Sequence, residues 1–470
     1  MKRALFLLSL LVLPAVAAER SMPNPLEASN FSVPAATEGR LSNGLEVRVV
    51  ENHERPLVWV TLAFRAGAFA DPPGKEGLGT ASMELMDDAA GPYDGIALSK
   101  ALKVLGTQLG SSAGSDGSGL SMQSLKRNLD ASLGIMSTVL TQPRFTEEDW
   151  KVQQVQMIAD VQARRNDPAS IADRVLLRVI HGDSYQGRLA SEASLSSLDT
   201  AQLKAWHKEH LSPAQSLLLV GGDTTLAEIQ PLLEKHFGAW KNEAKALDFP
   251  VAPPAPTQTQ IYLVDKPAAA QSVIQLGRYV GKPTDADYRP FVVANNAVGG
   301  MFTSRVNLNL REAKGYTYGA RSSVGFNLAG SLWTASAPVA TDVTVPALQE
   351  FLKELGGVSG DGALKVGETE NARNYLRNSF PLRFENPDYL LGQLTQIWRY
   401  SLPQDWISRY YEEMGKIQAE NAQAAWAARM EAAPLNIVVV GDAAVVEAGL
   451  AGLGIPMVKL DVDARPIAEK

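Results

Sequence analysis

The sequence predicts an α+β fold built from two similar αβ halves, and three observations support this. Residues 216–240 have the pattern of a buried strand, a turn and an amphipathic helix. Residues 435–454 repeat that order, again with Gly-Asp after the strand. Four prolines between residues 248 and 260 mark a linker. We therefore expect one domain at 19–247 and a second at 261–470.

Strand-like and helix-like patterns alternate along the first half. A chain of 470 residues with 45% apolar residues can form two to four packed units, so both halves can bury a core. The expected elements are, in order, two strand-like segments around an Asn-Gly turn at 40–52, a strand at 57–67, helices at 77–88 and 93–106, a Gly- and Ser-rich strand and loop at 109–125, and a helix at 146–168.

The helix at 146–168 has clear signals at both ends. Thr146 stands three residues before Asp149, and acidic residues occupy the first turn. Basic residues precede the Asn-Asp-Pro sequence at its end, where they complement the helix dipole.

The N-terminal residues have the pattern of a cleaved export signal at 1–18. A basic start precedes an apolar run from Ala4 to Leu13, and small residues suited to signal peptidase follow. The alternative is a membrane anchor, but the run is shorter than the roughly 20 residues that span a bilayer. We therefore expect a soluble protein in the periplasm.

Composition excludes several classes of function. The net charge is −7 without long runs of one sign, so the basic footprint of a nucleic-acid binder is missing. The chain has no cysteine, which excludes disulfides, a lipid-modified cysteine, thiolate metal sites and a cysteine nucleophile. No later apolar run approaches the length of a membrane span.

Several longer motifs then resemble a known family. They lie at 64–91, 163–168, 181–222, 268–278 and 295–324, and the last contains Gly-Gly-x-x-x-Ser-Arg, Leu-Arg-Glu and Gly-x-x-Tyr. With them the chain resembles the pitrilysin or insulinase family of zinc peptidases, in the two-domain form that includes the mitochondrial processing peptidase subunits. The resemblance implies two homologous domains, each a mainly antiparallel sheet packed with helices, in a clamshell arrangement.

Active members of that family carry an inverted zinc motif, HxxEH, on the helix that follows the glycine. Two histidines and a distant glutamate bind zinc, and the glutamate inside the motif activates water. In "GLGTASMELM", Thr80 and Glu84 occupy the histidine positions and Met83 occupies that of the base. The distant ligand position falls at about Asp160, with Gln153 a turn or two earlier. We therefore expect the helix to be structural and the chain to bind no zinc of its own.

Two other groups of residues have side chains that can bind metal ions. None of the five histidines lies near this helix, but Glu84 with Asp87, Asp88 or Asp160 could hold a hard cation through oxygen ligands. That alternative would make the chain a self-sufficient metallopeptidase with an unusual site. His207 and His210 lie on one helix, but no third ligand is evident, so we expect them to pack or to face solvent.

The second half retains a different part of the family's chemistry. In the family this half supplies an arginine and a tyrosine seven residues apart, and Arg311 and Tyr318 have that spacing. Such donors stabilise the negative charge that develops on the attacked carbonyl oxygen. The alternatives are a surface ion pair for Arg311 and sheet packing for Tyr318, with Tyr316 one pleat repeat away.

The family also contains heterodimers in which one chain bears the zinc motif and its partner bears the arginine and tyrosine. This sequence has the second pattern, so we expect a homologous zinc-bearing partner and Arg311 and Tyr318 acting in trans on peptide substrates. A substrate peptide could add as a strand to a sheet edge. The passage at 109–120 either faces that chamber or is a surface loop. The alternative function is a scaffold or peptide-binding protein without a catalytic role.

Overall fold

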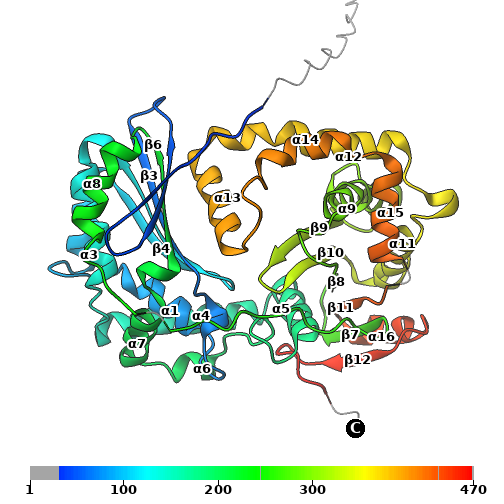
Figure 1. Ribbon diagram of the computed structural model, residues 1–470. Helices are drawn as coiled ribbons and strands as arrows, with labels where there is room; N and C mark the ends of the chain where they lie inside the picture. The colour runs from blue at the N-terminus through cyan, green and yellow to red at the C-terminus, as the bar shows by residue number, and fades with distance from the viewer. Residues whose placement is uncertain (1–30, 244, 432, 468–470) are drawn as a thin grey trace, which may run out of the picture. The chain divides into compact units, whose positions relative to one another are not determined.

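The computed structural model describes residues 31–243, 245–431 and 433–467 and contains two six-stranded mixed sheets packed with helices (Figure 1). The predicted α+β class with two similar αβ halves is thereby confirmed. The export signal expected at 1–18 lies outside the described residues.

The first sheet has the strand order β1-β2-β6-β3-β5-β4. Its neighbours are antiparallel except for β2 and β6, which are parallel. Every residue of β6 is buried, as expected for a central apolar strand. The strands are β1 (Thr37–Arg40), β2 (Glu46–Glu51), β3 (Leu57–Phe64), β4 (Gln108–Ala113), β5 (Ser118–Leu125) and β6 (Ser216–Gly222).

The second sheet has the order β12-β7-β11-β8-β10-β9, with β7 parallel to both β11 and β12. Apart from the outer strands β1 and β12, both sheets place the first strand of the half beside its last, then its second, fourth and third. This shared order is that of a duplicated unit. The strands are β7 (Gln260–Asp265), β8 (Gln271–Tyr279), β9 (Arg321–Asn327), β10 (Gly330–Ala340), β11 (Asn436–Gly441) and β12 (Met457–Leu460).

Helices pack against both sheets around separate apolar cores. The helices before β7 are α1 (Leu78–Met86), α2 (Gly95–Leu105), α3 (Leu129–Thr141), α4 (Glu147–Arg164), α5 (Pro168–His181), α6 (Glu192–Ser196), α7 (Thr200–His210) and α8 (Leu226–Phe237). Those after it are α9 (Tyr288–Asn295), α10 (Arg305–Asn307), α11 (Thr344–Gly356), α12 (Val366–Ser379), α13 (Pro387–Arg399), α14 (Ser408–Lys416), α15 (Ala419–Met430) and α16 (Ala443–Ala451).

Local sequence signals set the ends of several of these helices. The Thr146 hydroxyl accepts a hydrogen bond from Asp149 N at 3.1 Å and begins α4, as its sequence predicts. Asp94 caps α2, which ends at Gly106 with a φ of 61°. Residues 248–259 form no helix or strand, and the domain limits proposed at 247 and 261 remain a prediction.

One helix of each half packs on the sheet of the other half. Val175 and Leu176 of α5 pack in one apolar cluster with Val438 and Val440 of β11. Reciprocally, Leu391 of α13 packs against Leu217 and Leu219, which lie on the face of β6 that points away from the core of the first half. In Figure 1 α5 lies beside β11 and α13 beside the first sheet. Each half therefore completes the hydrophobic burial of the other.

A buried carboxylate adds a polar joint between the halves. Asp116, in the β4–β5 turn, accepts hydrogen bonds from Tyr185 Oη at 2.6 Å and from Tyr400 Oη at 3.1 Å. It also accepts one from Leu328 N at 2.9 Å, in the β9–β10 turn. Asp116 is 7% exposed, so these three donors share an acceptor that is largely removed from water.

His181, at the end of α5, makes the stability of this packing dependent on pH. Its ring meets Tyr279 of β8 edge-on at 5.4 Å, and burial lowers the pKa of His181 from 6.5 to about 4. The unfolded chain therefore binds the proton more tightly, so stability falls as the pH drops from about 6.5 to 4. We expect His181→Phe to remove about 2 to 3 kcal/mol of that fall. Urea unfolding of both proteins at pH 7 and pH 4 measures it, and equal losses would contradict it.

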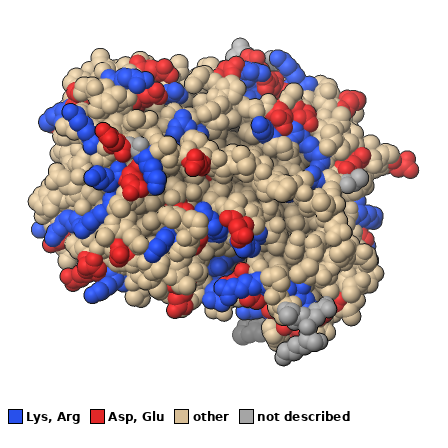
Figure 2. Space-filling model, turned by 60° about the horizontal axis from the view of Figure 1, so that its bottom comes forward, with Lys and Arg blue, Asp and Glu red and all other residues tan. Residues whose placement is uncertain are grey.

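The surface mixes charges of both signs. On the face drawn in Figure 2, Lys and Arg side chains are interspersed with Asp and Glu side chains, in keeping with the small net charge. Within the described part of the chain, no helix has the length and apolar character needed to cross a membrane.

Candidate functional site

The glycines at the start of α1 fix how this helix begins. Gly77 has a φ of 99°, which favours glycine, and a Cβ on Gly79 would lie 2.8 Å from the Trp206 ring. Asp71 accepts hydrogen bonds from Gly77 N at 3.0 Å and Gly79 N at 2.8 Å. Burial raises the pKa of Asp71 to about 7 against these bonds. Gly-Leu-Gly therefore begins α1 in close contact with α7.

The residues at the zinc-motif positions of α1 pack in the core or form hydrogen bonds. Met83 is fully buried in the core of the first half, while Thr80 and Glu84 are half-buried. Glu84 accepts a hydrogen bond from Gln153 Nε2 of α4 at 2.6 Å. Burial raises the pKa of Glu84, the bond to Gln153 opposes this, and the charge of Asp160 adds to it.

Two of the other carboxylates near α1 accept hydrogen bonds. Asp160 is exposed and accepts from Gln156 Nε2 of the same helix at 3.0 Å. Asp87 accepts from Ser111 N of β4 at 2.9 Å, and burial raises the pKa of Asp87 to about 6. Across residues 31–243, 245–431 and 433–467, no three His, Asp or Glu side chains are placed to hold one metal ion.

These residues do not fit the zinc ion that the family resemblance implies. Catalytic zinc takes three protein ligands with nitrogen or sulfur among them and leaves one position open to water. Here the ligand positions carry a hydroxyl and a carboxylate that is bonded to an amide, and the position of the base carries a buried thioether. We therefore derive no catalytic step through zinc on this chain.

The two histidines of α7 pack against their neighbours. His207 Nε2 lies 2.8 Å from the carbonyl oxygen of Leu140, and its ring meets Phe145 at 5.8 Å. The His210 ring lies 5.1 Å from that of Trp206. Burial lowers the pKa of both histidines, which favours their neutral forms.

Arg311 lies in a π-helical turn, η5 (Leu308–Ala313), and Tyr318 lies in the loop that connects this turn to β9. The Arg311 side chain is 37% exposed, pairs with Glu312 at 3.3 Å and lies over the Phe302 ring at 4.6 Å. Tyr318 is 88% exposed, and no hydrogen bond to its hydroxyl is found within the described chain. Both side chains are therefore accessible to another molecule.

The segment between them is anchored on both sides. Tyr316 packs against the core of the second half, so of the two tyrosines, Tyr316 and Tyr318, it is the one with a packing role. The Thr317 hydroxyl donates to the carbonyl oxygen of Pro338 on β10. Ala320 N donates to Asn307 Oδ1 at 3.1 Å. These contacts hold the loop that carries the exposed Tyr318 just before β9.

Two pockets were not predicted from the sequence. One, of about 370 Å³, borders the edge strand β9, and the other, of about 760 Å³, is rich in arginine. The first has no linear motif because its aromatic residues are spread along the second half. They are Tyr288, Phe326, Phe380, Tyr389, Trp406 and Tyr410.

Comparisons with known proteins agree with this architecture. Residues 197–376 match the family model described as the peptidase M16 inactive domain. The crystal structure of a peptidase M16 inactive domain from Pseudomonas fluorescens superposes with a TM-score of 0.80 at 21% identity, over 87% of this chain and 98% of that one. The periplasmic protease PqqL from Escherichia coli gives a TM-score of 0.72 at 14% identity, over 93% of this chain and 49% of that chain.

Curated relatives include zinc proteases. An uncharacterized zinc protease of Mycobacterium leprae is 22% identical over 278 residues, which are 57% of this chain and 61% of that protein. The chain thus spans less than two thirds of the length of this relative. The duplicated sheet order, the inactive-domain match at residues 197–376 and the zinc-protease homologues together support the resemblance of this chain to the peptidase M16, or pitrilysin, family.

Proposed function

We propose that this chain is the zinc-lacking subunit of an exported, periplasmic heterodimeric metallopeptidase. A homologous partner would supply the zinc, the base and the bound water, and this chain would supply Arg311 and Tyr318. The observation that carries the proposal is the exposure of Tyr318, which is 88% accessible in the loop that precedes the edge strand β9.

The chemistry of the pair suits a site completed in trans. Attack of a metal-bound hydroxide on a peptide carbonyl places negative charge on the carbonyl oxygen. A phenol and a guanidinium that approach from a second chain can donate hydrogen bonds to that oxygen. On the first half, by contrast, Met83 is fully buried and Glu84 is bonded to Gln153, so α1 has a packing role.

A co-purification experiment tests the partner. The tagged chain, recovered gently from its native cell envelope, should bring down a chain of similar size that bears HxxEH in stoichiometric amount. Repeated recovery of this chain alone would contradict the heterodimer.

A kinetic experiment on the recovered complex tests the two residues. We expect Tyr318→Phe and Arg311→Ala each to lower kcat by roughly a hundredfold while the subunits stay associated, as for loss of an oxyanion donor. Tyr375→Phe is the matched control because Tyr375 is also exposed, at 55%. Unchanged kcat in both variants would remove Arg311 and Tyr318 from the mechanism.

The aromatic pocket beside β9 favours a second candidate, a peptide-binding scaffold. β9 is an edge strand, so a peptide could add to it while Val324 and Phe326 of the pocket contact its side chains. Tight peptide binding by the isolated chain, with no peptidase partner recovered, would select this function. Its affinity would then fall on Phe326→Ala and stay unchanged in Tyr318→Phe.

A further inference from the structure

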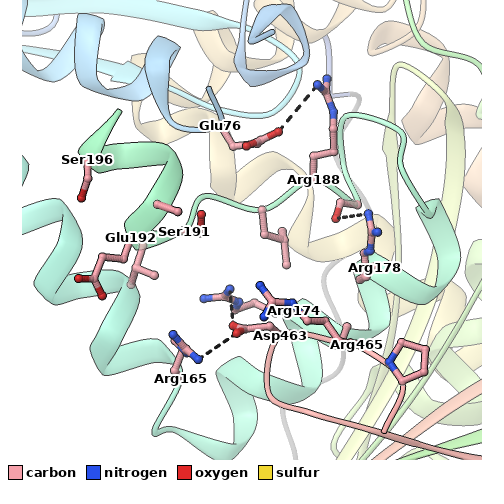
Figure 3. A pocket seen from close by; sticks show the side chains of 16 residues that line it. Glu76, Arg165, Arg174, Arg178, Arg188, Ser191, Glu192, Ser196, Asp463 and Arg465 are labelled. Atoms are coloured by element: carbon pink, nitrogen blue, oxygen red, sulfur yellow. Dashed lines mark hydrogen bonds and ion pairs between the residues drawn. The ribbon is translucent and has the colours of Figure 1, made fainter. Parts of the chain in front are cut away.

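The arginine-rich pocket of about 760 Å³ is lined by neither the zinc-motif positions nor Arg311 and Tyr318 (Figure 3). Its walls come from the end of α4, from α5, from residues 187–196 and from residues 463–466 of the C-terminal segment. It therefore joins parts of the chain that are far apart in the sequence. A cavity of this volume is of the size that takes a small molecule.

Positive charge exceeds negative charge in this lining. Five guanidinium groups and three carboxylates contribute to it. The charged residues are Arg165, Arg174, Arg178, Arg188, Arg465, Glu76, Glu192 and Asp463. Which of the arginines lack a full counter-charge decides where an anion would bind.

One wall of the pocket is short of acceptors around Arg174. Asp463 serves both Arg165, at 2.9 Å, and Arg174, at 3.8 Å, and Figure 3 shows the two arginines converging on it. The Arg174 side chain is 14% exposed, and its buried Nε has no acceptor within the described chain. Burial lowers the pKa of Arg174, the charge of Asp463 opposes this, and the neighbouring charge of Arg165 adds to it.

Across the pocket Arg188 is in a similar state. Its side chain is 17% exposed, and its ion pair with Glu76 is long, at 3.9 Å. Its buried Nε and Nη1 lack hydrogen-bond acceptors among the residues that the structure describes. Arg178, by contrast, pairs with Asp183 at 2.7 Å and needs no further partner. Glu192 accepts from Gln162, at 3.1 Å.

The C-terminal segment adds a fifth, exposed guanidinium. No ion pair to Arg465 is found in the described part of the chain. Its backbone is held in a tight turn, because Asp461 N donates to Arg465 O at 2.9 Å and Ala464 N donates to Asp461 O at 2.9 Å. Ala464 has a φ of 61°, a strained conformation that is frequent at ligand clamps.

We propose that this pocket binds a small anion with at least two acidic oxygens, a phosphate or a polycarboxylate, through Arg174, Arg188 and Arg465. Guanidinium forks match both kinds of oxygen pair. Such a ligand would accept hydrogen bonds from the buried nitrogens of Arg174 and Arg188 that have no acceptor among the described residues. Through Arg465 it would also link the C-terminal segment to α5.

Calorimetric titration of the purified chain with sodium phosphate and with sodium citrate tests the proposal, at constant ionic strength set by NaCl. Saturable binding is expected at concentrations up to about 10 mM, and Arg465→Gln should weaken it by about tenfold. Arg174→Gln should weaken it at least as much. Arg127→Gln is the matched control because Arg127 is exposed and lies outside the pocket.

Each outcome decides something. Binding of only one of the two anions supports the site and identifies the ligand as a phosphate or a polycarboxylate. Absence of saturable binding by both anions overturns the proposal. Binding that Arg465→Gln leaves unchanged overturns it as well, and this exposed variant decides the matter even where Arg174→Gln fails to fold.

Discussion

Replacing Asp116 by alanine is expected to lower the free energy of unfolding by about 3 to 5 kcal/mol. The substitution leaves the hydroxyls of Tyr185 and Tyr400 and the backbone N–H of Leu328 without their acceptor at a site that is 7% exposed. Because two of these donors belong to the second half, the loss acts on the joint between the halves. Urea unfolding at pH 7 measures the change.

Two further variants separate this joint from general effects of substitution. Tyr400→Phe removes one donor and keeps the acceptor, so it should cost about 1 kcal/mol. Asp248→Ala removes an exposed carboxylate and should change stability by less than about 0.5 kcal/mol. If Asp116→Ala changed the free energy of unfolding as little as Asp248→Ala does, the hydrogen bonds to Asp116 would not contribute to the stability of the protein.

The sequence predicted those features that depend on neighbours along the chain. The cap of α4 at Thr146, the repeated strand and helix, and the α1 helix after Gly77 all follow from local patterns. Periodicity also indicated that α1 keeps an apolar face, and the side chains that form it are all buried: Leu78, Ala81, Leu85 and Met86.

Contacts between residues far apart in the sequence could not be predicted, for a physical reason. The exchange of α5 and α13 between the two sheets depends on which apolar faces meet in three dimensions, and period alone does not specify a partner. The arginine pocket brings Arg165 to Asp463 across 298 positions. Arg174 and Arg178 could have been noticed, because they lie four residues apart on one helix face, but nothing local pairs them with Arg465.

The candidate site shows the same division. The loss of the zinc motif could be seen from Thr80, Met83 and Glu84 alone. The motif spacing placed both Gln153 and Asp160 near the distant ligand position. Only the packing of α4 on α1 shows that Gln153 bonds Glu84, whereas Asp160 bonds Gln156 of its own helix. The roles proposed for Arg311 and Tyr318 depend on a second chain, and no property of one chain specifies its partner.

Restoring the general base at position 83 is expected to destabilise the protein, which is the sharpest test of the structural role of α1. Met83→Glu places a carboxyl group at a fully buried position in the first core, and we expect a loss of about 4 kcal/mol or more at pH 7. Met83→Leu keeps volume and polarity and should cost less than about 1.5 kcal/mol.

The pH dependence of this variant identifies the cause of the loss. Burial raises the pKa of a carboxyl group, so the native variant holds a proton that the unfolded chain releases above about pH 4. The penalty of Met83→Glu should therefore grow as the pH rises from 4 to 7, and urea unfolding at both values measures it. A variant as stable as the parent at pH 7 would mean that position 83 faces water. That result would contradict the structural role proposed for α1.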